Sequence, residues 1–155
     1  MLQRFIPALR LVLLLMLLMT GGNARATSAE SLDLASLRGK VVYVDFWASW
    51  CVPCRQSFPW MNEIQQQFGK EGLVVIAVNV DHDRADADAF MSRLAPTFRV
   101  SFDPGGALAE QFHVKGMPTS ILIDRSGKVL AQHIGFRLED RGPLREQIRT
   151  LLAAH

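Results

Sequence analysis

Continuous runs of apolar residues predict the strands of a β-sheet in this chain. The run Val41–Trp47 is apolar on both faces except at Asp45, a pattern typical of a central strand that is covered on both sides. A second run, Leu73–Val80, is continuous and rich in β-branched residues, which predicts a second buried strand. Shorter strands are expected over Val100–Phe102, Thr119–Asp124 and Val129–Ile134, with the turn Arg125–Lys128 joining the last two as a hairpin.

Apolar positions spaced three and four residues apart predict helices between these strands. The first helix contains Pro59 and has Ile64 and Phe68 as its clearest core positions. Asp83 is a good N-cap residue for the second helix. The predicted helices span Cys51–Phe68, Asp83–Ala95, Ala107–Phe112 and Leu138–Ala154. Because helices separate the first strands and a hairpin comes late, the order predicts an α/β sandwich with a mixed central sheet.

The first 26 residues differ in composition from the rest of the chain. Arg4 and Arg10 supply positive charge beside an unbroken apolar stretch, Leu11–Met19, that is short for a membrane span. Ala24-Arg25-Ala26 is a small-x-small cleavage signature. We therefore expect residues 1–26 to be a signal peptide cleaved after Ala26, with an uncleaved N-terminal anchor as the alternative. Residues 27–155 are then one domain, exported to the periplasm.

The charge of the chain gives no indication of nucleic-acid binding. The whole sequence has a formal net charge of +2, but Arg4, Arg10 and Arg25 lie in the leader. Without them, 14 basic residues face 15 acidic ones, a net charge of −1. A domain with this balance lacks the basic excess that neutralises phosphates, so no nucleic-acid partner is expected.

The only two cysteines, Cys51 and Cys54, form a Cys-x-x-Cys pair between a buried strand and a helix, which is typical of a redox site. A purely structural disulfide is one alternative, but closing so short a loop stabilises little. Half of a zinc site is another, but the histidines show no paired ligand spacing: they are His82, His113, His133 and His155. The acidic stretch Asp81–Asp88 lacks the glycine and closing glutamate of a calcium loop. We therefore expect neither a metal nor a cofactor.

Thiol–disulfide exchange gives each member of the pair a role. Cys51, at the first turn of the helix, meets unpaired backbone donors and the positive helix end, which favour its thiolate and make it the nucleophile. Cys54 lies three residues on, within disulfide reach, as the more buried resolving thiol. Asp45, in an apolar strand, is the candidate proton acceptor for Cys54, with a pKa raised by desolvation. The alternative is a solvated aspartate at the strand end.

Three motifs of this chain resemble the thioredoxin superfamily. They are Asp45-Phe-Trp-Ala-x-Trp-Cys-x-x-Cys54, the in-helix Pro59, and Gly116-Met117-Pro118-Thr119. The resemblance implies a thioredoxin-like three-layer sandwich over residues 27–155, with a mixed central sheet flanked by helices. The added helix and short strand between Asp81 and Phe102, and the run Thr119-Ser-Ile-Leu-Ile-Asp-x-x-Gly, resemble the exported TlpA-like branch, which includes reductases that serve cytochrome c maturation.

The resemblance also implies a wall that binds substrate. Pro118 would have a cis peptide bond and face Cys51, and the backbone of Met117 would pair with an extended substrate segment. Gly135 resembles the family glycine that lets substrate approach this groove. Trp50 would shield the rim of the site.

Three positions depart from the family pattern. The TlpA-like branch often has Asn where Asp45 stands, and Glu where Ser57 stands. Thioredoxins often carry a Lys at the position that aligns with Ala77. All three departures bear on how protons are handled near the cysteines.

Together these features predict an exported thiol–disulfide oxidoreductase that reduces protein disulfides through Cys51 and Cys54, in cytochrome c maturation or in periplasmic thiol homeostasis. The expected partners are a disulfide-bearing protein substrate and a membrane thiol that donates electrons, because the compartment itself is oxidising. We expect a monomer. The alternatives are a disulfide oxidase or isomerase, a peroxidase, and a non-catalytic thiol-gated binding module or metallochaperone, for which His113 is the candidate ligand.

Overall fold

A five-stranded mixed sheet lies at the centre of the molecule, in the strand order β3-β2-β1-β4-β5. The strands are β1 (Val41–Trp47), β2 (Leu73–Asn79), β3 (Arg99–Phe102), β4 (Thr119–Ile123) and β5 (Val129–Ile134). β1 pairs in parallel with β2, and β2 with β3, whereas β4 is antiparallel to both β1 and β5. The predicted mixed sheet is confirmed, and β1 is its middle strand, with every residue buried.

The computed structural model describes residues 32–154. The predicted leader over residues 1–26, its cleavage after Ala26, and His155 lie outside the described residues. Within residues 32–154, no helix is both long and apolar enough to cross a membrane.

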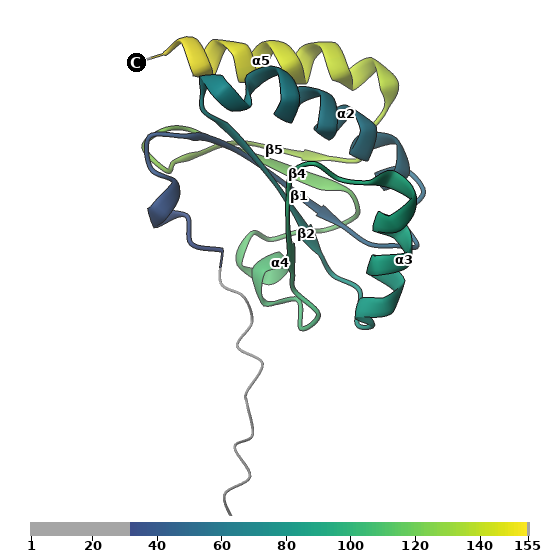
Figure 1. Cartoon of the computed structure of the whole chain (residues 1–155). Coiled ribbons are helices and arrows are strands. Elements are labelled where there is room, and N and C mark those ends of the chain that lie inside the picture. Colours follow the sequence, from purple (N-terminus) through teal and green to yellow (C-terminus); the bar gives the residue numbers. More distant parts are fainter. Residues whose placement is uncertain (1–31, 155) are drawn as a thin grey trace, which may run out of the picture.

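Helices cover both faces of the sheet and complete three layers (Figure 1). The helical elements are η1 (Ala35–Leu37), α2 (Cys54–Phe68), η2 (Gly69–Glu71), α3 (Arg84–Leu94), α4 (Ala107–Gln111), η3 (Leu138–Asp140) and α5 (Arg141–Ala153). α2 and α5 lie side by side over one face, where Arg145 of α5 forms an ion pair of 3.0 Å with Glu63 of α2. α4 and the segment around η1 cover the other face. The predicted three-layer, thioredoxin-like architecture is confirmed.

Two buried clusters, one on each face, hold these layers together. Because side chains of a strand alternate between faces, Tyr43 and Trp47 of β1 point toward α2, and Val44 and Phe46 point toward α4. The Trp47 ring packs edge-on against Phe58 of α2, with 4.8 Å between centroids. By the same alternation, the Asp45 side chain also faces α2, the helix that begins at Cys54.

Two predicted helix boundaries are wrong. α2 begins at Cys54 rather than Cys51, because Val52 and Pro53 form a turn in which the Arg55 N–H donates to the Val52 carbonyl at 3.1 Å. The last predicted helix is divided into the short 3₁₀ turn η3 and the helix α5, which begins at Arg141. The capped start of α3 agrees with prediction, since the Asp83 side chain accepts the Ala85 N–H at 2.9 Å.

Arg125, in the turn between β4 and β5, connects segments from both ends of the domain. Its guanidinium donates to the Gly39 carbonyl at 2.7 Å and to the Leu152 carbonyl at 3.0 Å. We expect Arg125→Ala to lower the free energy of unfolding by about 1–3 kcal/mol, because two charge-assisted hydrogen bonds are lost. Urea denaturation measures this loss.

The matched control is Arg38→Ala, which removes one hydrogen bond, to the Ser126 carbonyl, from an exposed arginine. It should cost less than Arg125→Ala. Equal losses in the two variants would show that the double contact of Arg125 adds nothing.

Candidate active site

Cys51 and Cys54 form a disulfide at the point where β1 leads into α2. Their Cα atoms are 5.3 Å apart. Cys51 lies in the loop after β1, where its N–H donates to the Ala48 carbonyl at 3.1 Å, and Cys54 is the first residue of α2. The turn over Val52 and Pro53 therefore places one cysteine just before the helix and the other inside it.

The two sulfurs of this pair have different surroundings. The backbone N–H of Cys54 donates to the Cys51 sulfur at 3.2 Å, and the first turn of α2 contains no acidic residue. A donor and a helix N-terminus both favour negative charge on Cys51. Cys54 is completely buried, whereas Cys51 is 3% exposed and has the exposed Trp50 and Val52 as chain neighbours. An incoming sulfur therefore has access to Cys51 first.

The β4 end of the sheet brings a second chain segment to the end of β1. Phe46 pairs in register with Thr119, so the residues just before β4 lie beside the carboxyl end of β1. The peptide bond between Met117 and Pro118 is cis. The Pro118 carbonyl accepts the Gly135 N–H at 2.8 Å, which fixes the segment after β5 against the same loop. Three segments far apart in the sequence therefore meet at one end of the sheet.

The backbone of Met117 is unpaired within the described residues, and Gly135 leaves open space beside it. Within residues 32–154, neither the N–H nor the carbonyl of Met117 makes a backbone hydrogen bond. Gly135 has a φ of +87°, and a Cβ placed on it would meet no atom within 4 Å. Beside them, Ile134 is 58% exposed. An unpaired backbone beside open space and an apolar side chain is the arrangement that binds an extended peptide strand to strand.

The three tryptophans divide between rim and core. Trp50 is 68% exposed, next to Cys51. Trp47 and Trp60 are completely buried, and the Trp60 ring packs against Tyr43 and Phe136, with 5.5 Å between centroids in each pair. Only Trp50 is placed where a partner protein can touch it.

Asp45 is a buried carboxyl without a cation beside it. It is 1% exposed, and its Oδ2 has no hydrogen-bond partner among residues 32–154. Its register partners are Ala77 on β2 and Ser120 on β4, neither of which carries charge. Burial therefore raises the pKa of Asp45 well above its ordinary value. A carboxyl whose pKa is raised in this way is a stronger base than an ordinary aspartate and can accept a proton.

Asp81 holds the loop that precedes the cysteines, a role that sequence reasoning missed. Its carboxylate accepts the Ser49 N–H at 2.9 Å, the Ser49 hydroxyl at 3.1 Å and the Asn79 amide at 2.8 Å. The available signal was the position of Asp81 just after β2, beside the end of the parallel strand β1. The interpretation of residues 81–88 as an acidic stretch concealed it.

A mixed sheet of this order, with a Cys-x-x-Cys disulfide before its first long helix and a cis proline facing the same end, defines a thioredoxin-like protein. The sequence profile of the Redoxin family matches residues 14–148. The chain belongs to the redoxin family.

Curated relatives of the chain are thiol-disulfide oxidoreductases. ResA of Bacillus anthracis is 33% identical over 112 residues, which are 72% of this chain and 65% of the relative. ResA of Bacillus subtilis strain 168 is 33% identical over 104 residues, 67% of this chain and 58% of the relative. The chain thus spans less than two thirds of the length of these relatives.

Solved structures share the fold. A protein from Chlorobium tepidum, provisionally named thiol:disulfide interchange protein DsbE, is 52% identical, with a TM-score of 0.76 over 77% of this chain and 85% of the other. The exposed lipoprotein thioredoxin Etrx1 of Streptococcus pneumoniae is 33% identical, with a TM-score of 0.66 over 76% of this chain and 90% of the other.

The Asp81 contacts predict a measurable loss of stability in Asp81→Asn. The amide would present a donor to groups that are themselves donors, so we expect a loss of about 1–3 kcal/mol in the free energy of unfolding. Asp88→Asn is the matched control, since Asp88 makes one exposed ion pair with Arg84 at 2.9 Å and should cost less than about 1 kcal/mol. If Asp81→Asn cost no more than Asp88→Asn in urea denaturation, Asp81 would not be an anchor of the loop.

The buried Asp45 predicts a stability difference that grows with pH. The unfolded chain ionises this carboxyl near pH 4, but the folded protein keeps the proton to higher pH. The free energy of unfolding of the wild type therefore falls as the pH rises from the pKa of the unfolded chain to that of the folded protein. Asp45→Asn has nothing to ionise and should become progressively more stable than the wild type above pH 4. The gain is about 1.4 kcal/mol for each pH unit in which only the folded state holds the proton.

Denaturation by urea between pH 4 and pH 8 measures this difference. Asp124→Asn is the opposite control, because a hydrogen bond from the Ser126 hydroxyl lowers the pKa of Asp124. Its carboxylate favours the folded state above pH 4, so the variant should lose stability there. A pH-independent difference for Asp45→Asn would mean that Asp45 is ionised in the folded protein.

Proposed function

We propose that this protein is a thiol–disulfide oxidoreductase that reduces disulfide bonds of other proteins through Cys51 and Cys54. The observation that carries the proposal is the asymmetry of the pair. The Cys51 sulfur accepts the Cys54 N–H at 3.2 Å and lies next to exposed Trp50, while Cys54, three residues on, is fully buried. This is the arrangement that an attacking thiol and a resolving thiol require.

In the reduced protein, the Cys51 thiolate attacks one sulfur of the substrate disulfide. A mixed disulfide forms, and the other substrate sulfur leaves as a thiolate that takes a proton from water. Cys54 then loses its proton and attacks the Cys51 sulfur. The second substrate thiolate leaves, the Cys51–Cys54 disulfide forms, and two electrons have passed to the substrate. We assign the acceptance of the Cys54 proton to Asp45, whose raised pKa suits a base that must also release the proton.

The substrate is a disulfide-bearing protein that presents an extended segment to the groove. The unpaired backbone of Met117 would form hydrogen bonds with it, Pro118 would separate it from Cys51, and Gly135 would leave room for its main chain. Trp50 would cover the rim. The exposed Ile134 gives the groove an apolar side.

We place this activity in the periplasm, on the predicted leader over residues 1–26. The relatives support an exported role, since one similar structure is an exposed lipoprotein thioredoxin. An oxidising compartment returns the pair to its disulfide, so each cycle needs two electrons from a membrane thiol donor. The TlpA-like features support cytochrome c maturation or general thiol homeostasis as the process it serves.

Insulin reduction in the presence of dithiothreitol tests the activity. The wild type should accelerate precipitation of the insulin B chain, and Cys51→Ser should remove the acceleration, because no nucleophile remains. Cys54→Ser should instead retain a mixed disulfide with insulin, visible in a non-reducing gel. Full activity in Cys51→Ser would refute the proposal.

The midpoint potential of the Cys51–Cys54 couple then fixes the direction. A value near about −270 mV is that of a reductase, and a value near about −120 mV is that of an oxidase. We expect the first, and the second would replace reduction by disulfide formation.

A further inference from the structure

Three polar side chains lie in one row across the face of the sheet that α5 covers. Asp45 on β1 is in register with Ser120 on β4, and Ser120 is in register with His133 on β5. Register partners point to the same face, and neighbouring strands lie about 4.8 Å apart, so the row runs about 10 Å toward the sheet edge. Exposure rises along it, from 1% at Asp45 and 5% at Ser120 to 41% for the His133 side chain.

A cavity of about 150 Å³ lies beside this row, between the sheet and α5. Its lining residues are Tyr43, Ser120, Leu122, Ala131, Gln132, His133, Leu144 and Gln147. A cavity of this size accommodates water, and Tyr43, Ser120, Gln132, His133 and Gln147 offer polar partners for it. The cavity therefore connects Tyr43 and Ser120 with His133, and Asp45 adjoins it through its register partner Ser120.

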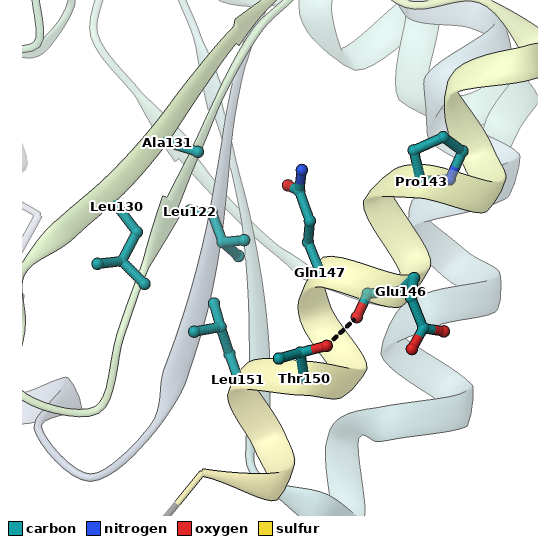
Figure 2. A pocket seen from close by; sticks show the side chains of 8 residues that line it. All are labelled: Leu122, Leu130, Ala131, Pro143, Glu146, Gln147, Thr150 and Leu151. Carbon is teal, nitrogen blue, oxygen red and sulfur yellow. Dashed lines mark hydrogen bonds between the residues drawn. The ribbon is translucent and has the colours of Figure 1, made fainter.

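This cavity adjoins a wider groove that Figure 2 shows between β5 and α5, with a volume of about 530 Å³. The two share Leu122, Ala131 and Gln147 as lining residues. In Figure 2 the Gln147 side chain extends from α5 into the space beside the strands. Solvent in the groove is therefore next to the cavity.

Two buried polar atoms at the inner end of the row have no hydrogen-bond partner among residues 32–154. The Tyr43 hydroxyl and Asp45 Oδ2 are both buried and make no hydrogen bond within residues 32–154. They belong to alternate residues of β1, which point to the same face. The Tyr43 hydroxyl is close enough to Ser120 to interact with it, although the present side-chain positions form no hydrogen bond. A buried polar group left alone costs about 1–3 kcal/mol, so two such groups on one face of β1 indicate a shared role for them.

We propose that Tyr43, Ser120 and His133 form a proton route between Asp45 and solvent, with His133 as the group that exchanges protons with water. The proposal rests on the assignment of Asp45 as the base for Cys54. The thiol proton moves to the Asp45 carboxylate, then through the Tyr43 and Ser120 hydroxyls and cavity water to the His133 imidazole, which releases it to solvent. One proton enters the route and one leaves it for each disulfide that Cys54 closes.

The outer end of the route has suitable electrostatics. Nε2 of His133 is 3.5 Å from Oδ2 of Asp140. The same oxygen accepts the backbone N–H of Arg137 at 2.7 Å, and Nε of Arg137 lies 3.9 Å from it. From α5, Leu144 and Gln147 line the cavity and neither titrates. On the inner side, Tyr43 is the other ionisable group beside Asp45, and burial raises the pKa of its phenol. His133 is therefore the member of the row whose side chain reaches solvent.

A two-step reaction of the full-length, reduced protein with dithiobis(nitrobenzoate) tests the route. The first thionitrobenzoate is released when Cys51 attacks the reagent, and the second only when Cys54 attacks the mixed disulfide. We expect His133→Gln to leave the first step unchanged and to slow the second about three- to tenfold at pH 7. Tyr43→Phe, which removes only the hydroxyl, should slow the second step in the same way.

Three controls separate a proton route from a packing effect. His82→Gln alters an exposed histidine of another loop and should leave both steps unchanged. Added imidazole should return the second step of His133→Ala to within about twofold of the wild type, because the missing proton carrier is replaced in solution. In an Asp45→Asn background, His133→Gln should have no further effect, since both residues act in one path.

The outcomes distinguish the route from the proposed function. Absence of the first release in the wild type would overturn the function itself, because Cys51 would not be reactive. A normal first step with a second step that is as fast in His133→Gln as in His82→Gln would overturn the route alone. Failure of imidazole to restore His133→Ala, or additive effects of the Asp45 and His133 changes, would also overturn it.

Discussion

The whole site depends on the complete burial of β1 between β2 and β4. A strand paired on both sides and covered on both faces has a fixed register. The position of the loop that follows the strand is fixed with it. Cys51 follows β1, Asp81 follows β2 and Pro118 precedes β4, so all three meet at one end of the sheet. The position of the disulfide is therefore set by backbone pairing, and the Asp81 contacts to Ser49 stabilise the short loop that remains.

Burial of β1 and of the helix start beside it also makes it difficult for Cys54 to lose its proton. Cys54 is inaccessible to water, yet it must lose a proton before it can attack. A neighbouring lysine would favour the ionised form of Asp45, which can accept a proton. The residue beside Asp45 on β2 is instead Ala77. A carboxyl without a cation holds its proton more strongly, which makes it a better acceptor and a slower donor. Proton release therefore becomes the step for which the rest of the face, from Tyr43 to His133, matters most.

Local patterns in the sequence predicted the strands, the cysteine pair and the order of elements, because those depend on residues close together in the chain. They predicted a start of α2 three residues too early, because the residues of the turn over Val52 and Pro53 fit the pattern of a helix as well. The contacts of Asp81 and the row from Asp45 to His133 could not be predicted in this way. They depend on strand register between segments up to 88 residues apart, and in the sequence His133 stands only among the histidines that show no paired ligand spacing.

The edge strand β5 serves both halves of the proposed chemistry without conflict. Its end at Ile134 and Gly135 borders the proposed substrate groove, while Leu130, near its start, lines the opening beside α5 in Figure 2. Leu130 and Gly135 are five residues apart, about 17 Å along a strand. His133 also points toward α5, and its neighbour Ile134 points to the opposite face. In the proposed function, a protein bound along Met117 and Gly135 would leave the opening beside α5 in contact with water, so the proton could depart while the substrate is still held.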